Sequence, residues 1–350
     1  MSVKDQLYKY LNQKNLNKTT SDEEFNKKLP ILVDNLLEYG FQQIVKDYND
    51  NLSSESDDWY KLKNYKHKKT NVFNINAQST VGLSIIKKHM NHIYDVKNYK
   101  GQCISGLWEK ENLEKVLKVN RKSHSTPYVS EIIRQLGFMA GTSKVTIYRP
   151  LLTKMIVEYF EAKEVLDVCV GWGGRMLGSA CIDGVKYTGI EPCKKTYDGL
   201  NEIKKNLKLN NVTLHKNGAE NVLPKLEKKY DLALTSPPYY NLEIYSDEKS
   251  QSHQEGGTYE DWYESFLKPV VHGVLEKLKE DGTSCWSVKN FKTDKNYKLY
   301  DDIVTLHEEK GWNKIDTEFF VGNSVRPGSK SKDGNAKKSK EITYVFKKLD

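Results

Sequence analysis

Four consecutive residues, Ser236-Pro237-Pro238-Tyr239, combine groups that could handle an amine. They follow an apolar run, 230–235, that is typical of a buried strand. Prolines cannot donate to a sheet, so the pair ends the strand and holds the backbone in one conformation. The carbonyl oxygens of such a rigid turn, with the Ser236 hydroxyl, could accept hydrogen bonds from both N–H groups of an amine. Those bonds would free the lone pair of the nitrogen for attack. Tyr239 could stack on a planar ring.

A second candidate site follows an earlier apolar run. Asp167 lies in that run, and Gly171 and Gly173 form a turn that leads into a helix. Glycine lets the backbone pass close to a ligand because no Cβ stands in the way. Glu191 ends the next run, about twenty residues after the turn, which is the spacing of a carboxylate that binds a ribose diol. The sequence therefore predicts a site for a nucleoside-type ligand.

The elements that position these residues begin near residue 145. From there short apolar runs alternate with amphipathic stretches, which predicts a doubly wound α/β sheet. We expect seven strands, at residues 165–170, 187–191, 212–215, 232–235, 283–288, 314–321 and 342–346. We expect helices at 175–181, 194–209, 220–228 and 259–279. Only a loop separates the last two strands, so they should form an antiparallel terminal hairpin.

The residues before 145 divide by charge into two segments. Residues 1–59 carry 7 Lys/Arg against 11 Asp/Glu and have a helical apolar stripe, opened by Pro30 and interrupted at Gly40. The segment 60–144 is mixed, with short helical stretches, and basic: residues 60–150 carry 17 Lys/Arg against 5 Asp/Glu. Residues 151–350 carry 31 of each. A basic segment of this kind suits nucleic acid, although a solvated lysine-rich surface explains the composition equally well.

The bulk composition excludes several classes of protein. With 37% apolar and 29% charged residues, the chain is globular rather than disordered or fibrous. Its five cysteines show no zinc spacing, so we expect neither a metal site nor a disulfide. No apolar segment reaches the ~18 residues of a membrane span, and no signal peptide is evident. We therefore expect an intracellular protein, cytoplasmic or nucleoid-associated, without a membrane partner.

Together these motifs resemble the amino-methyltransferases that act on N6 of adenine or N4 of cytosine. Their signature is Asp, Asn or Ser, then Pro-Pro and an aromatic residue, and the resemblance covers roughly residues 145–348. It implies a class I, Rossmann-like fold, S-adenosylmethionine as cofactor, and catalysis by residues 236–239. The cofactor-binding residues implied by the resemblance, or by position along the chain, are Tyr148, Arg149, Pro150, Asp167, Gly171, Gly173, Glu191, Ala219, Glu220 and Ser236.

The sequence also departs from the family pattern. Cys169 replaces the usual aromatic residue of the cofactor turn, and Trp172 lies inside the turn instead. Ser236 replaces the Asp or Asn of adenine enzymes, and within the family serine leans toward cytosine. The segment 240–245 resembles viral and phage-type enzymes. Adenine and cytosine therefore both remain open, with N6 of adenine slightly ahead on its greater frequency.

The resemblance implies DNA as substrate, with RNA an alternative. Candidate nucleic-acid contacts are Arg121, Lys122, Lys289, Asn290, Arg326, Lys330, Lys337 and Lys338, the last four in the basic loop 326–340. Target recognition would come from residues 60–145, from the insertion 246–258 or from a partner subunit, and a homodimer is also open. Rival functions are an RNA adenine methyltransferase, a protein glutamine methyltransferase and an inactive cofactor- and nucleic-acid-binding subunit.

Overall fold

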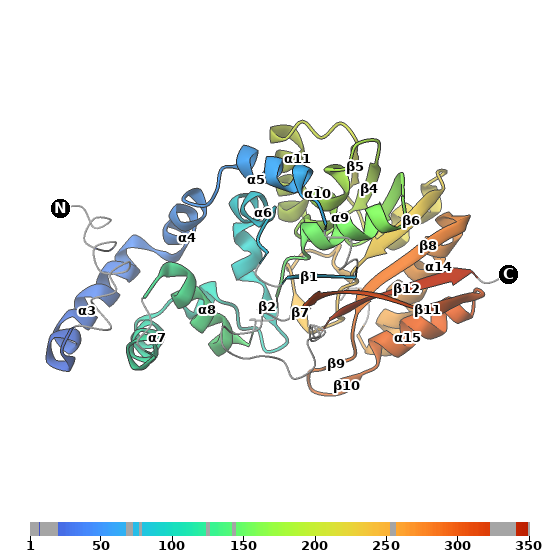
Figure 1. Ribbon diagram of the computed structural model, residues 1–350. Helices are drawn as coiled ribbons and strands as arrows, with labels where there is room; N and C mark the ends of the chain where they lie inside the picture. The colour runs from blue at the N-terminus through green and yellow to red at the C-terminus, as the bar shows by residue number, and fades with distance from the viewer. Residues whose placement is uncertain are drawn as a thin grey trace, which may run out of the picture. The chain divides into compact units, whose positions relative to one another are not determined.

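The computed structural model describes residues 7, 20–67, 73–76, 79–123, 127–141, 145–252, 257–322 and 341–348. The chain forms two compact units (Figure 1). Unit 1 comprises Met1–Leu52, Asn91–Thr146 and Glu243–Tyr245, and unit 2 comprises Ser53–Met90, Ile147–Leu242 and Ser246–Asp350. The expected basic loop 326–340 lies outside the described residues.

These units cut across the segments expected from charge. Residues 53–90 group with the sheet rather than with the helical unit. One reason is Lys154, a buried lysine whose ammonium group donates to the carbonyl oxygens of Leu62, Lys63 and Tyr65 at 3.0, 2.7 and 2.9 Å. A buried ammonium group needs such acceptors, so the helix that ends at Asn64 is fastened to the sheet unit.

Unit 1 is mainly helical, as expected. Its elements are α3 (Asp22–Tyr39), α4 (Phe41–Asp50), η1 (Asn91–Asp95), β2 (Lys97–Asn98), η2 (Ser105–Leu107), α7 (Lys110–Lys122), α8 (Val129–Ala140) and β7 (Glu243–Ile244). Helix α3 begins after Ser21, whose side chain accepts from the Glu24 amide, so Pro30 lies inside the helix rather than opening it. The expected break at Gly40 is present, with φ of 82°. Side chains such as Leu36, Ile44 and Val116 form the core of this unit.

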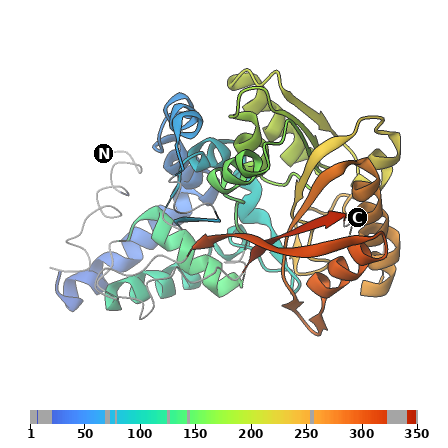
Figure 2. The same cartoon turned by 45° about the vertical axis from the view of Figure 1, so that its right-hand side comes forward.

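Unit 2 is built on a twisted sheet of eight described strands (Figures 1 and 2). In spatial order these are β1 (Asn74–Asn76), β11 (Trp312–Gly322), β12 (Ile342–Lys348), β8 (Leu278–Val288), β6 (Tyr230–Thr235), β3 (Glu164–Asp167), β4 (Lys186–Ile190) and β5 (Val212–His215). All seven expected strands are present, and β1 is an eighth that was not expected. Strand β12 is antiparallel to both β8 and β11, whereas the other neighbouring pairs are parallel. This is the order and direction of a class I methyltransferase sheet with its terminal hairpin.

Helices cover both faces of the sheet. They are α5 (Glu55–Asn64), α6 (Leu83–His89), α9 (Pro150–Tyr159), α10 (Gly174–Ala180), α11 (Lys194–Asn206), α12 (Ala219–Val222) with η3 (Leu223–Lys225), α13 (Tyr259–Trp262) with the π-helix η5 (Tyr263–Leu267), α14 (Lys268–Lys277) and α15 (Leu299–Glu308). The expected helix at 220–228 is shorter because Pro224 turns the chain into a 3-10 turn. Helix α15 was not expected, nor was the small hairpin of β9 (Phe291–Lys292) and β10 (Asn296–Tyr297).

The core of unit 2 packs helix side chains against the sheet. Leu166, Ala233 and Trp286 from the strands are buried in one cluster with Val270 of α14 and Ile303 of α15. Because β3, β4, β6 and β8 run parallel, the residues that follow them meet at one edge of the sheet. Among the described residues, no helix has both the length and the apolar character that a bilayer crossing requires.

Candidate active site

The turn after β3 has the backbone conformation that its glycines predicted. Gly171 and Gly173 have φ of 56° and 90°, values that residues with a side chain rarely adopt. A Cβ on Gly171 would meet nothing closer than the Cys169 carbonyl oxygen at 4.0 Å. Gly174 serves a different purpose, since a Cβ there would lie 1.8 Å from the carbonyl oxygen of Tyr148. Glycine therefore shapes the turn and also lets α10 pack against the chain before α9.

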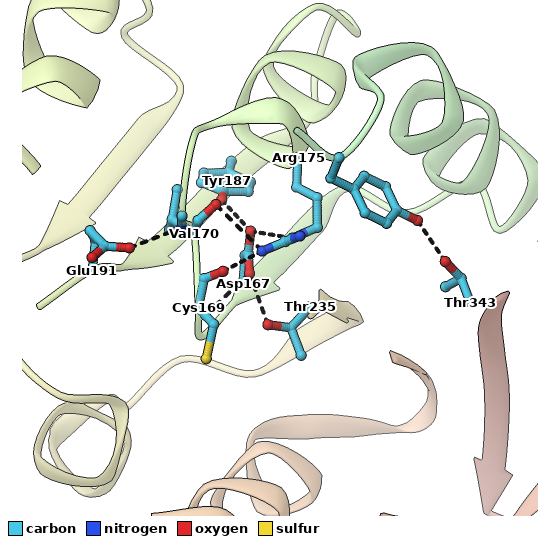
Figure 3. Close-up of polar contacts among 10 residues, drawn as sticks. Asp167, Cys169, Val170, Arg175, Tyr187, Glu191, Thr235 and Thr343 are labelled. Atoms are coloured by element: carbon cyan, nitrogen blue, oxygen red, sulfur yellow. Dashed lines mark hydrogen bonds and ion pairs between the residues drawn. The ribbon is translucent and has the colours of Figure 1, made fainter. Parts of the chain in front are cut away.

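Asp167 lies beneath this turn at the end of β3 and is completely buried (Figure 3). Its Oδ2 atom accepts hydrogen bonds from Nε of Arg175 at 2.8 Å and from the hydroxyl of Tyr187 at 2.7 Å. Its Oδ1 atom accepts from the Thr235 hydroxyl at 3.0 Å and from the Cys169 amide at 3.3 Å. These four donors fill the acceptor positions of a carboxylate. The structure thus gives Asp167 four protein partners, two of which belong to the glycine turn and the helix that follows it.

Arg175 is a site residue that sequence reasoning missed. Its guanidinium group is buried and donates to the carbonyl oxygens of Cys169 and Val170, both in the turn (Figure 3). Burial alone would lower the pKa of Arg175, but the Asp167 carboxylate raises it, so the side chain stays charged. The group also lies 5.2 Å from the ring centroid of Tyr148. A lone arginine at the start of an apolar helix was the available signal.

Of the expected residues, Pro150 is the first residue of α9, Arg149 is its N-cap residue, and Tyr148 precedes them. The Tyr148 hydroxyl lies 2.7 Å from Oγ1 of Thr343 on β12. Arg149 donates to the Ser79 carbonyl oxygen at 3.2 Å, and burial lowers the pKa of its guanidinium group. Pro150 occupies the first turn of the helix, where its missing N–H costs nothing.

Glu191 follows β4 and lies against the glycine turn. Its Oε2 atom accepts from the Gly171 amide and its Oε1 atom from the Cys193 amide, each at 2.9 Å. Burial raises the pKa of this carboxyl group to about 7. The described part of the insertion 246–258 lies next to it, because Glu248 accepts from the Lys194 amide at 3.1 Å. The described part of the insertion therefore packs against residues 192–194, directly after Glu191, a position that the sequence did not reveal.

The other expected cofactor residues lie after β5. Ala219 is buried and begins α12, and Glu220 follows it half-buried. The side chain of Asn221 donates to Oε1 of Glu220. Both residues thus come from the edge of the sheet at which β3 and β4 also end.

The Ser-Pro-Pro-Tyr turn begins directly after β6, as predicted. Ser236 and Pro238 are half-buried, and Pro237 is buried. Tyr239 is 6% exposed, and its ring meets the ring of Phe291 at 5.5 Å and 76°. The ammonium group of Lys289 lies 5.7 Å from the Tyr239 ring centroid. A base that stacks on Tyr239 must therefore displace one of these neighbours.

Tyr240, the next residue, has a strained backbone with φ of 48°. Its ring lies in an aromatic cluster with those of Tyr259, Trp262 and Tyr297, at centroid distances of 5.5, 5.8 and 5.6 Å. Positive φ in a bulky residue costs energy and persists only where the surroundings impose it. The packing of this cluster therefore helps to hold the turn in its conformation.

Two residues expected to contact nucleic acid have hydrogen-bond partners within the protein. Arg121 donates to the Thr20 carbonyl oxygen and to Asp22 at 3.1 Å, so it holds the start of α3. Asn290 accepts from the Tyr300 amide at 2.9 Å and donates to Asp301 at 3.1 Å in the first turn of α15. The sequence could not show these partners because they depend on tertiary packing.

The remaining candidate nucleic-acid contacts are two lysines in the described part of the chain and four residues outside it. The ammonium group of Lys289 lies beside the Ser-Pro-Pro-Tyr turn and 3.7 Å from Oε2 of Glu341, and Lys122 is exposed at the end of α7. Arg326, Lys330, Lys337 and Lys338 lie outside the described residues. Over the part of the chain that the structure covers, no three His, Cys, Asp or Glu side chains gather in a way that could hold a metal ion.

Comparison with known proteins gives a family match for part of the chain. Residues 230–350 match the model of a DNA methylase family of the N6/N4 type. No curated protein matches the chain.

Among solved structures, the chain is similar to TrmN from Thermus thermophilus, with 16% identity, a TM-score of 0.37, and coverage of 57% of this chain and 49% of that one. It is also similar to NSun6 from Pyrococcus horikoshii, with 17% identity, a TM-score of 0.41, and coverage of 59% and 53%. The chain thus spans about half the length of these two proteins. A putative rRNA methylase from Clostridium thermocellum is 13% identical at a TM-score of 0.38, with 58% of this chain and all of that chain covered.

The strand order establishes the fold independently of these similarities. The Ser-Pro-Pro-Tyr turn follows β6 within the matched residues. The chain has the class I methyltransferase fold, and its residues 230–350 match the N6/N4 DNA methylase family.

Proposed function

We propose that the protein transfers a methyl group from S-adenosylmethionine to an exocyclic amino group of a base in DNA, with N6 of adenine ahead of N4 of cytosine. The observation that carries the proposal is the Ser-Pro-Pro-Tyr turn at the end of β6, next to the glycine turn after β3. The match to a DNA methylase family over the same residues favours DNA over RNA.

The residues at the sheet edge fit S-adenosylmethionine. Glu191 offers a carboxylate whose two oxygens accept only one backbone amide each among the contacts of the described residues, which leaves lone pairs for two ribose hydroxyls. The glycine turn has open space on the side where a Gly171 Cβ would project. Ala219 and Glu220 would lie beside the adenine ring. Arg175 and Asp167 would support the turn from behind.

When bound, S-adenosylmethionine supplies a methyl group activated by a sulfonium charge. The protein's task is to make a poor nucleophile react, since the lone pair of a base amino group is delocalised into the ring. The Ser236 hydroxyl and the carbonyl oxygens of the proline turn would accept hydrogen bonds from the two N–H groups of that amine. Because the turn is rigid in advance, little ordering remains for the reaction step.

A base must leave the double helix to reach such a turn. Tyr239 would stack on it, and Lys289, close to that ring, would exchange its ion pair with Glu341 for a phosphate contact. Recognition of the target sequence would come from residues 60–145, from the insertion 246–258 or from a partner subunit. In a homodimer, each of the two chains would provide these nucleic-acid contacts.

The test uses purified protein, labelled S-adenosylmethionine, and unmethylated DNA and RNA in parallel reactions, with nucleosides resolved by mass spectrometry. N6-methyladenine or N4-methylcytosine in DNA is the expected product. Label only in RNA would favour an RNA adenine methyltransferase, and label only in protein a glutamine methyltransferase. Tight cofactor binding without transfer to any of these would favour an inactive subunit.

A further inference from the structure

We propose that Thr235 is a positioning residue that sets the distance between the catalytic turn and the cofactor turn. It acts through Asp167 rather than by touching a substrate. This inference rests on the proposed function, since the two turns matter together only if an amine and a methyl donor must meet.

The hydrogen bond between Thr235 and Asp167 is buried, and its acceptor oxygen is shared with a second donor. Thr235 is the last residue of β6 and is 1% exposed. Its hydroxyl donates to Oδ1 of Asp167 at 3.0 Å, and the same oxygen accepts the Cys169 amide at 3.3 Å (Figure 3). One oxygen atom thus binds the residue before Ser236 and a residue of the cofactor turn. A buried hydrogen bond to a charged group is among the stronger ones.

No backbone pairing between β3 and β6 joins the two strands at Thr235. The ladder between β3 and β6 pairs Val165 with Leu232 and Leu166 with Ala233. Its last pair therefore lies two residues before Thr235. The Thr235–Asp167 bond continues the connection beyond that pair, at the point where both strands pass into functional turns.

The carboxylate is fixed independently of Thr235. Its other oxygen, Oδ2, is held by Arg175 and Tyr187. Loss of the Thr235 hydroxyl would therefore leave the cofactor turn supported, while the start of the catalytic turn would keep its backbone pairing to β8 at Trp286 and lose its link to β3. Since misplacement by about 1 Å can lower a rate about 100-fold, that change should appear in kcat rather than in cofactor affinity.

The first experiment compares Thr235→Val, which keeps the shape and removes the hydroxyl, with Thr235→Ser, which keeps the hydroxyl. Thr283→Val makes the same change in a buried threonine of β8 opposite Leu232. Calorimetry gives the Kd for S-adenosylmethionine, and a DNA methylation assay gives kcat and KM.

We expect Thr235→Val to lower kcat about 10- to 100-fold with both Kd and KM within about twofold of wild type. Thr235→Ser should recover kcat to within about threefold, and Thr283→Val should behave as wild type. An unchanged kcat in Thr235→Val, an equal loss in Thr235→Ser, or a parallel loss of cofactor affinity would overturn the proposal.

A second experiment needs no activity. Amide hydrogen exchange is followed with and without S-adenosylhomocysteine. In wild type the ligand should slow exchange in peptides covering both 168–176 and 234–242, whereas in Thr235→Val only the first should be protected. Equal protection of both in the variant would refute the link. Absence of methylation by wild type would instead count against the proposed function alone.

Discussion

The Nε atom of Arg175 lies 2.8 Å from Oδ2 of Asp167, and the two side chains are 5% and 0% exposed. Removal of one member of a buried ion pair leaves the other charge uncompensated. We therefore expect Arg175→Met to lower the free energy of unfolding by about 3–5 kcal/mol. Urea denaturation measures this change. Arg134→Met, which breaks an exposed pair with Glu131, should cost less than about 1 kcal/mol, and an equal loss in both variants would contradict the prediction.

Gly174 provides a steric test of the packing between α10 and the chain before α9. A Cβ at this position would lie 1.8 Å from the Tyr148 carbonyl oxygen, so Gly174→Ala must displace backbone. Gly311 has φ of 75° and open space around it, so Gly311→Ala adds only backbone strain of about 1–2 kcal/mol. We expect Gly174→Ala to destabilise the protein more, by thermal or urea unfolding. A smaller loss than in Gly311→Ala would show that α10 can move away.

Glu191 should make stability depend on pH. Burial raises its pKa from an ordinary 4.5 to about 7, so the native state holds a proton that the unfolded chain lacks between these values. Its contribution to stability is therefore present below pH 4.5 and is lost as pH rises through 7, by an amount on the order of 3 kcal/mol. Urea unfolding of wild type and Glu191→Gln at pH 5, 6, 7 and 8 isolates this effect. Parallel profiles for the two proteins would mean that Glu191 titrates near its ordinary pKa.

Pro238 should matter for the reaction and little for the cofactor. Pro238→Ala lets the catalytic turn sample other conformations, and we expect kcat to fall about 100-fold or more with the Kd for S-adenosylmethionine nearly unchanged. Pro224→Ala, in the 3-10 turn after α12, is the matched control and should retain kcat. Survival of activity in Pro238→Ala would show that the catalytic assignment is wrong.

Substitutions of Lys289 and of Arg121 should have different effects on DNA binding. Lys289→Met removes a cation beside the catalytic turn, so it should weaken DNA binding and reduce the slope of log K against log salt by about 1. Arg121→Met removes a group that holds the start of α3, so it should lower stability and leave that slope unchanged. Fluorescence anisotropy at several salt concentrations measures both. The reverse result would exchange the two roles.

The sequence by itself determined the elements whose signals are local. The strand at Val212–His215 was predicted to the residue, and the glycine and proline turns were found where the structure has them. Apolar periodicity, glycine conformation and the missing N–H of proline act over a few residues, so they can be recognised without knowledge of the fold. The same holds for the antiparallel terminal hairpin, which followed from a connection without a helix.

The tertiary structure alone decided what those elements contact. The three residues of β1 become a strand only because β11 is beside them. Arg121 and Asn290 looked available for phosphates, yet packing gives them protein partners. The bond between Thr235 and Asp167 joins residues 68 positions apart, and the partners that fill the Asp167 carboxylate come from two strands, a helix and the turn after β3. Such contacts depend on which chain segments share a core, a property that no local pattern encodes.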